Sequence, residues 1–281
     1  MLLQRVITAL VLLAILLPAL FWPGPEPFAI VVLVLLGAGA WEWGRLNGLG
    51  QTGSLLSAAA CLALCALAWS QGLVTRALTP MWLAAGAGWV LLGGLALRRG
   101  VAGWPLVPRS VRIPLGIFLL WLAWLAVAQA RVIGVNFLLS VFALVWVADI
   151  AAYFAGRAFG LRLVRVRLAP SISPGKSWEG AWGGMLAVLA LAWAWSLIDA
   201  AWHLGSPSLF SRLAERGWAF AVVACLFLAA MSVVGDLFES LVKRSAGAKD
   251  SSGLLPGHGG VLDRVDALLP TLPLALMLVN L

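Results

Sequence analysis

Nine long apolar stretches run through this chain of 281 residues, and they constrain its fold more than any other feature. A helix needs about 20 predominantly apolar residues to cross the hydrocarbon core of a bilayer. Stretches of that kind occupy roughly residues 5–22, 27–43, 53–73, 79–97, 113–130, 134–158, 178–200, 217–240 and 263–281. Since 63% of the residues are hydrophobic, we expect an all-α, polytopic integral membrane protein with about nine transmembrane helices.

The apolar stretches follow one another too closely to leave room for a separate soluble domain. No long polar segment interrupts them, so we expect a single membrane domain over residues 1–281. Arg5 precedes the first stretch, as a cation precedes a secretory signal, but no small-x-small cleavage pattern follows it. We therefore expect the first stretch to be a retained helix.

The distribution of cationic residues predicts how the helices are oriented. With the N-terminus inside, 15 of the 19 Lys and Arg residues fall in inner segments and four in outer loops. Because cytoplasmic loops accumulate cations, we expect a cytoplasmic N-terminus. The same rule explains the net charge of +8 without a nucleic-acid partner. Three cysteines, all inside apolar stretches, argue against a disulfide framework or a zinc site.

A charged and glycine-rich segment, residues 240–266, joins the last two apolar stretches on the predicted cytoplasmic side. Asp236, Glu239 and Lys243 share one helical face at its start, and Asp263 and Asp266 are one turn apart at its end. Carboxylates gathered in one place disfavour each other's ionisation unless a cation lies between them. Because hard oxygen ligands suit Mg²⁺, the spacing predicts a magnesium site formed by the three aspartates.

Cations and backbone amides in the same segment indicate phosphate groups as ligands. Lys243, Arg244 and Lys249 would neutralise phosphates, and the N–H groups around residues 257–260 would add donors. The alternative is a positive-inside loop with scattered counter-ions. That alternative does not account for three aspartates at helical spacing beside three cations and five glycines.

Asp149 and Tyr153 form a smaller polar cluster, one turn apart on the sixth apolar stretch. An ionisable residue this deep in an apolar run is costly, which makes Asp149 a candidate for ligand contact. Asp149 could equally pair with Arg157 and serve packing alone.

A second small cluster, Lys176, Ser177 and Glu179, precedes the seventh stretch. Ser177 can cap the helix, with Glu179 in its first turn beside the helix dipole. Neither role explains Lys176, which is either a phosphate cation or a positive-inside charge.

Three runs together resemble one enzyme family. The pattern S-x-x-K-R-x-x-x-x-K-D, followed by L-P-G-H-G-G-x-x-D-R-x-D, is unbroken from Ser240 to Asp266. It is similar to the signature of the phosphatidate cytidylyltransferase (CDP-diglyceride synthase) family. The runs D-x-x-A-Y-x-x-G-R-x-x-G at 149–160 and S-P-x-K-S-x-E-G at 173–180 are also similar to family patterns. A signature with this many fixed polar positions is specific.

The resemblance implies an Mg²⁺-dependent nucleotidyltransferase that makes CDP-diacylglycerol and pyrophosphate from CTP and phosphatidate. It further implies a homodimer in a bacterial-type plasma membrane, with the site facing the cytoplasm. Residues 113–281 would then hold the catalytic helices, while residues 1–112 match no motif and have no assigned role. The implied catalytic residues are Asp236, Asp263, Asp266, Lys243 and Arg244, and those for substrate binding are Ser240, Lys249, His258, Gly259, Gly260, Lys176 and Asp149.

Two other classes of membrane protein use intramembrane acids. A CDP-alcohol phosphotransferase would show a D-G-x-x-A-R run, which this sequence lacks. An ion-coupled transporter would relay cations through Asp149 and Asp236 and would distribute its polar residues over two related halves. This chain concentrates them in its C-terminal half, and CTP-dependent pyrophosphate release would distinguish the enzyme from both.

Overall fold

The computed structural model describes residues 2–202 and 205–281. All the secondary-structure elements in these residues are helices. Within these residues, β-pairing is limited to two isolated bridges. The elements are α1 (Leu2–Phe21), α2 (Glu26–Leu46), α3 (Gln51–Ser70), α4 (Thr79–Gly88), the π-helix η1 (Trp89–Gly93), α5 (Gly94–Gly103), α6 (Arg109–Ile133), α7 (Val135–Phe159), α8 (Trp178–Trp202), α9 (Leu209–Ala214), α10 (Trp218–Ser245), α11 (Leu262–Val265) and α12 (Leu268–Asn280).

Eight helices in the described part of the chain are long and apolar enough to cross a membrane. They are α1, α2, α3, the continuous run from α4 through η1 to α5, α6, α7, α8 and α10. These eight coincide with the first eight predicted spans, so the prediction of an all-α, polytopic membrane protein is confirmed. The ninth predicted span differs, because it divides into the short α11 and the 13-residue α12.

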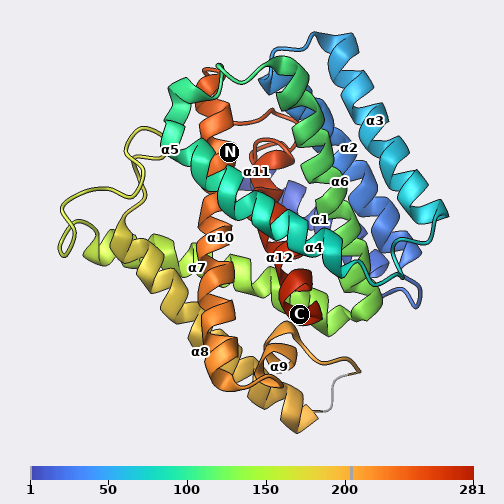
Figure 1. Cartoon of the computed structure of the whole chain (residues 1–281), viewed down its shortest axis with the longest axis vertical. Helices are drawn as coiled ribbons and strands as arrows, with labels where there is room; N and C mark the ends of the chain where they lie inside the picture. The colour runs from blue at the N-terminus through green and yellow to red at the C-terminus, as the bar shows by residue number, and fades with distance from the viewer. Residues whose placement is uncertain (1, 203–204) are drawn as a thin grey trace.

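The helix α12 lies at the centre of the molecule instead of along its surface (Figure 1). At 1.5 Å per residue it is about 20 Å long, which is less than the bilayer core of about 30 Å. Leu269, Leu272, Leu274 and Leu276 are all buried. A helix that is apolar on every side suits a protein core as well as a bilayer, which is why composition alone predicted a ninth span.

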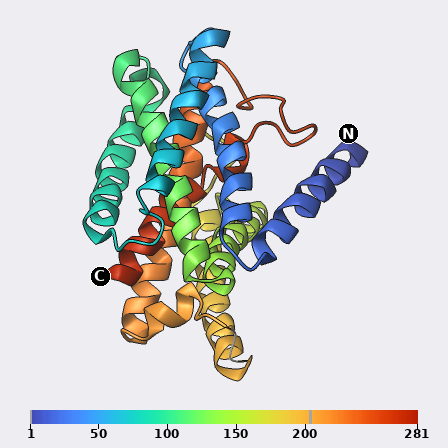
Figure 2. The ribbon, with the colours of Figure 1, turned by 90° about the vertical axis from the view of Figure 1, so that its right-hand side faces the viewer.

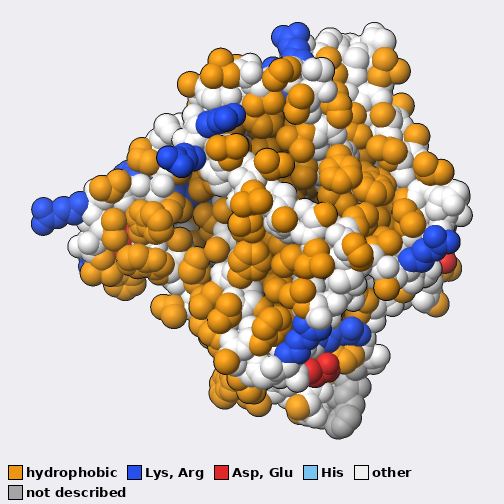
Figure 3. Space-filling view, viewed as in Figure 1, with side chains coloured by type: hydrophobic (Ala, Val, Ile, Leu, Met, Phe, Trp, Pro, Cys, Tyr) orange, Lys and Arg blue, Asp and Glu red, His pale blue; other side chains and the backbone are white. Residues whose placement is uncertain are grey.

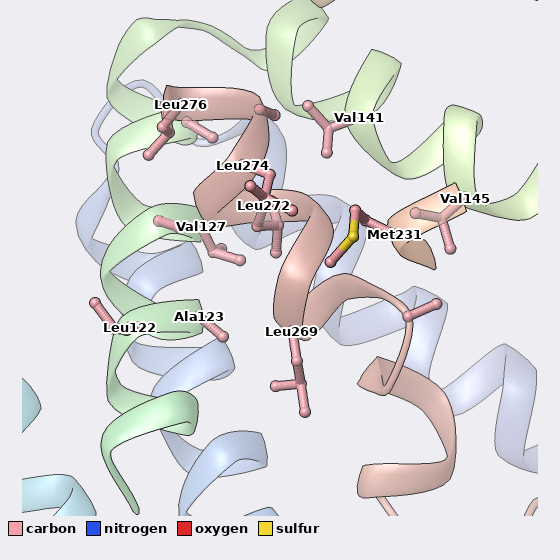
Figure 4. Packing of buried hydrophobic residues seen from close by; sticks show 14 of the residues in the cluster. Leu122, Ala123, Val127, Val141, Val145, Met231, Leu269, Leu272, Leu274 and Leu276 are labelled. Atoms are coloured by element: carbon pink, nitrogen blue, oxygen red, sulfur yellow. The ribbon is translucent and has the colours of Figure 1, made fainter. Parts of the chain in front are cut away.

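Side chains of three long helices pack around α12 (Figure 4), and α4 also packs against it. Leu122, Ala123 and Val127 come from α6, Val141 and Val145 from α7, and Met231 from α10. Because α10 packs on α12 while both also contact α7, the polar end of α10 is held against a rigid core. This arrangement fixes the helix that carries Asp236.

The helices α7 and α8 form a closely packed pair on one side of α10, and α2, α3 and α6 form the opposite side (Figure 1). The loop of residues 160–177 joins α7 to α8 and extends from the edge of the molecule in this view. Hydrophobic side chains cover most of the face in Figure 3, with few Lys and Arg side chains among them, as expected for a surface in contact with lipid.

The first helix projects away from the other helices (Figure 2). Its C-terminal end is held by the Arg131 side chain, which donates hydrogen bonds to the carbonyl oxygens of Leu20 and Trp22. Near its other end, Thr8 Oγ1 donates to the Pro256 carbonyl oxygen at 2.9 Å. The loop between α10 and α11 therefore reaches α1, although most of α1 exposes apolar side chains.

Candidate active site

The C-terminal half of α10 carries a row of polar side chains on one face. Ser240 Oγ donates a hydrogen bond to Asp236 Oδ1 at 3.3 Å, and Lys243 Nζ lies 2.5 Å from Glu239 Oε2. Both pairs are one helical turn apart, which confirms the shared face predicted from their spacing.

The junction of α11 and α12 lies directly against α10 because position 235 is a glycine. A Cβ at Gly235 would lie 2.5 Å from the Asp266 carbonyl oxygen, so no larger residue fits there without a backbone shift. This close approach brings Asp236 near Asp266. Asp266 lies between α11 and α12, outside the eight helices that could span a membrane. Burial, followed by the negative charge of Asp236, raises the pKa of Asp266 to about 7.

A cavity of about 630 Å³ opens between α7, α8 and α10. Asp149, Tyr153 and Arg157 of α7 line it together with Lys176 and Asp236. Lys176 Nζ lies 2.6 Å from Asp236 Oδ2, so residues 60 positions apart form an ion pair in its wall. Three segments with predicted polar clusters thus meet in one place.

The start of α8 fixes the loop that carries Lys176. Ser177 Oγ accepts a hydrogen bond from the Gly180 N–H at 3.2 Å, which confirms its predicted role as a helix cap. Glu179 lies in the first turn of α8, as predicted, and it also binds the preceding loop. Its Oε1 accepts hydrogen bonds from the N–H groups of Leu163 and Val164 at 2.9 and 2.8 Å. The buried Glu179 side chain therefore ties the loop to α8.

Asp263 is the centre of a second polar cluster beside the first. Its Oδ1 lies 2.5 Å from Lys243 Nζ, and its Oδ2 accepts hydrogen bonds from the N–H groups of Ser251 and Gly260 at 2.9 and 2.7 Å. Burial alone would raise the pKa of Asp263, but these donors outweigh it and hold the pKa below its ordinary value. Asp263, on α11, is therefore a carboxylate in this site.

Three of the predicted site residues form no described side-chain hydrogen bond or ion pair with the residues around Asp236 or with those around Asp263. Arg244 is exposed and donates to the Ala248 carbonyl oxygen at 3.3 Å, while Lys249 is exposed and forms no ion pair among the described residues. The His258 carbonyl oxygen accepts two hydrogen bonds from the Arg264 side chain. Their predicted substrate contacts stay predictions.

A comparison with known families decides the class of protein. The model of the family described as "Cytidylyltransferase family" matches residues 3–281. The chain belongs to this family. The match confirms the resemblance drawn from the motifs and extends it to the first four helices, where no motif was found.

Two of three named relatives cover almost the whole length of this chain. The chain is 39% identical to phosphatidate cytidylyltransferase of Pseudomonas aeruginosa over 277 residues, which cover 97% of this chain and 95% of the relative. It is 36% identical to phosphatidate cytidylyltransferase of Haemophilus influenzae over 291 residues, covering 97% and 96%. The protein of that name in Thermotoga maritima is 42% identical over 130 residues, covering 46% and 44%.

The carboxylates of this cytidylyltransferase fit Mg²⁺ by their chemistry, although lysines pair with two of them. No group of three or more His, Cys, Asp or Glu residues is gathered for a metal within the described ranges. Asp236 pairs with Lys176, and Asp263 with Lys243. Because Mg²⁺ commonly takes one or two carboxylates plus waters and phosphate oxygens, the neighbouring Asp236 and Asp266 offer a suitable donor set.

The N-terminal helices of the cytidylyltransferase contribute one residue that no motif singled out. Glu42 of α2 is fully buried and binds the loop between α10 and α11. In the sequence, Glu42 is recognisable as an acid within the apolar stretch 27–43. Burying such an acid is costly unless other groups bind it. The alternative pairing of Asp149 with Arg157 is not found among the described ion pairs, and Arg157 instead lies 3.5 Å from the Tyr153 hydroxyl.

Proposed function

We propose that this chain is a phosphatidate cytidylyltransferase, which transfers CMP from CTP to phosphatidate and releases pyrophosphate. One observation carries the proposal within the family: Asp149, Lys176 and Asp236, from three separate motifs, line the same cavity. That cavity adjoins the Lys243–Asp263 ion pair through α10. The two relatives that cover almost the whole chain are both phosphatidate cytidylyltransferases, which supports the same substrate pair.

The reaction needs charge screening more than proton transfer. A phosphate oxygen of phosphatidate attacks the α-phosphorus of CTP, the bond from that phosphorus to the bridging oxygen of the β-phosphate breaks, and pyrophosphate leaves with the electron pair. The second pKa of a phosphate monoester is about 6, so the nucleophile is already an anion near neutral pH. No general base is required, but two polyanions must be brought together.

Lys176 and Lys243 are the cations placed to bring the two substrates together. In this proposal each lysine exchanges its carboxylate partner for a phosphate oxygen when substrates bind, which retains a charge-assisted contact. Mg²⁺ held by Asp236 and Asp266, with Asp263 beside them, would supply further neutralisation of the phosphate charges. Ser240 keeps the Asp236 carboxylate oriented through its hydrogen bond.

The proposed site opens to the cytoplasm, where CTP is found, and to the headgroup layer, where phosphatidate lies. The 15 to 4 division of cations supports this orientation and a cytoplasmic N-terminus. The homodimer implied by the family resemblance stays a prediction. A multi-pass protein of the bacterial plasma membrane is consistent with the bacterial relatives and the eight long apolar helices.

The test is the formation of CDP-diacylglycerol by the purified full-length chain. Protein in detergent micelles would receive phosphatidate, radiolabelled CTP and MgCl₂, and the lipid fraction would be analysed for label. We expect label in the lipid and an equal amount of pyrophosphate. A protein that binds both substrates but produces neither product would contradict the proposal, as would activity with CDP-diacylglycerol and an alcohol alone.

A further inference from the structure

Glu42 is a carboxylate buried in α2, far from the catalytic motifs in sequence and in direct contact with their loop. None of its surface is exposed. Oε1 accepts hydrogen bonds from Ser252 Oγ at 2.5 Å and the Val261 N–H at 2.9 Å. Oε2 accepts from Ser251 Oγ at 3.1 Å and the Leu262 N–H at 2.8 Å. These four donors come from both ends of the 251–262 loop.

The residues bound by Glu42 are the same ones that surround Asp263. The Ser251 N–H donates to Asp263 Oδ2, and the Ser251 hydroxyl lies within hydrogen-bond distance of both carboxylates. Leu262 directly precedes Asp263 on α11. The loop is also fitted tightly around the carboxylate, because a Cβ at Gly260 would overlap both Glu42 Oε1 and Ser251 Oγ.

We propose that Glu42 is a positioning residue for catalysis, which holds the 251–262 loop and α11 so that Asp263 stays paired with Lys243, beside the Mg²⁺ that Asp236 and Asp266 would hold. The inference rests on the proposed function, since Asp263 belongs to its reacting site. It assigns a role to the N-terminal helices, for which the motifs indicate none. None of the four described hydrogen-bond partners of Glu42 lines the cavity, so Glu42 acts on the site through the loop.

Four donors around one side chain require two acceptor oxygens. A glutamine has the same shape but only one acceptor oxygen, and its NH₂ group would face one of the two donor pairs. A serine hydroxyl can rotate to accept from that NH₂ group, whereas a backbone N–H cannot. The N–H of Val261 or Leu262 would therefore lose its partner inside the protein, which is unfavourable.

The experiment compares Glu42→Gln with Glu26→Gln in the full-length protein. Glu26 is an exposed acid on the same helix with no side-chain hydrogen bond or ion pair among those the structure describes, so it controls for the loss of a charge in α2. Hydrogen–deuterium exchange over residues 251–266 is the first measurement, and it needs neither substrate nor metal. We expect faster exchange in Glu42→Gln only there, with unchanged exchange in Glu26→Gln and in the 160–177 loop of both variants.

The second measurement separates positioning from a loss of folded protein. We expect Glu42→Gln to lower kcat by about 10- to 100-fold, the usual effect of removing a group that orients a metal ligand, and to raise the Mg²⁺ concentration for half-maximal rate. A smaller fraction of folded molecules would lower kcat without changing that concentration. Unchanged exchange at 251–266, or an unchanged Mg²⁺ dependence in Glu42→Gln, would overturn the proposal.

Ser252→Ala provides a second variant in case Glu42→Gln does not fold. It removes one donor to Glu42 and no hydrogen bond to Asp263. We expect a smaller change in exchange over 251–266 and in the Mg²⁺ dependence, in the same direction. The absence of both changes in Ser252→Ala would count against the proposal. If the wild-type protein forms no CDP-diacylglycerol, the proposed function fails, whereas the exchange result still tests whether Glu42 holds the loop.

Discussion

At the scale of single residues, each acid in the site is held by a different set of partners. Asp236 pairs with Lys176 and Ser240, while Asp263 pairs with Lys243 and with amide groups of its own loop. Glu239 pairs with Lys243 and has no other polar partner in the part of the chain that the structure describes, although its side chain is almost entirely buried. Because the number of donors differs, the same loss of charge has different consequences at each position.

Replacement of Asp263 by asparagine tests this difference. Asparagine keeps the shape of aspartate but not its charge, and it has one acceptor oxygen for donors that now use both. We expect kcat to fall by about 100-fold or more, equivalent to about 2.7 kcal/mol, while membrane insertion and yield stay normal. Steady-state CDP-diacylglycerol formation at saturating Mg²⁺ is the measurement.

Glu239→Gln is the matched comparison for Asp263→Asn, because it removes the other carboxylate that pairs with Lys243. Glutamine leaves Lys243 paired with Asp263, so we expect a smaller loss of activity than in Asp263→Asn. Wild-type kcat in Asp263→Asn would rule out its part in the reaction. A larger loss in Glu239→Gln than in Asp263→Asn would reverse the assignment of the two acids.

At the scale of elements, the 160–177 loop depends on one side chain of the helix that follows it. Glu179 accepts two backbone N–H groups of the loop, and the loop carries Lys176 into the cavity. The spacing of the residues predicted the cap at Ser177, because capping is local along the chain. It could not predict the bonds from Glu179 to residues 15 and 16 positions earlier, since the path of a loop is set by its packing.

Glu179→Gln is expected to loosen this loop, because the neutral amide oxygen of glutamine accepts the Leu163 and Val164 N–H groups more weakly than a charged carboxylate oxygen does. Arg162, Arg165 and Arg167 are exposed in the loop, so trypsin should cut there several-fold faster than in the wild-type protein. We also expect a higher KM for CTP, because Lys176 is less well placed. Glu215→Gln, at an exposed position before α10, is the control. Equal cleavage in all three proteins would contradict this role of Glu179.

At the scale of the whole molecule, the sequence was sufficient for the eight long helices and indicated most residues of the candidate site. Eight of the nine predicted spans are long helices in the structure, because hydrophobicity is a local property, and helical spacing together with the signature predicted Asp236, Lys243 and Asp263 as site residues. The interior position of α12 was not predictable from composition, since a core helix and a short span have the same residues. The partners of Glu42, 209 to 220 positions later, were equally out of reach, because an acid in an apolar stretch indicates that other groups bind it but not which groups these are.

The orientation of the whole molecule gives the last prediction. If 15 of the 19 cations lie in cytoplasmic segments, α10 begins at the external face of the membrane and ends at its cytoplasmic face. Single cysteines would be introduced as Glu215→Cys and Ala246→Cys, both exposed and at opposite ends of α10, after replacement of Cys61, Cys65 and Cys225. In intact cells, an impermeant maleimide should label position 215 and should label position 246 only after the membrane is opened. Labelling of position 246 from outside would place the proposed site away from CTP and contradict the cytoplasmic orientation.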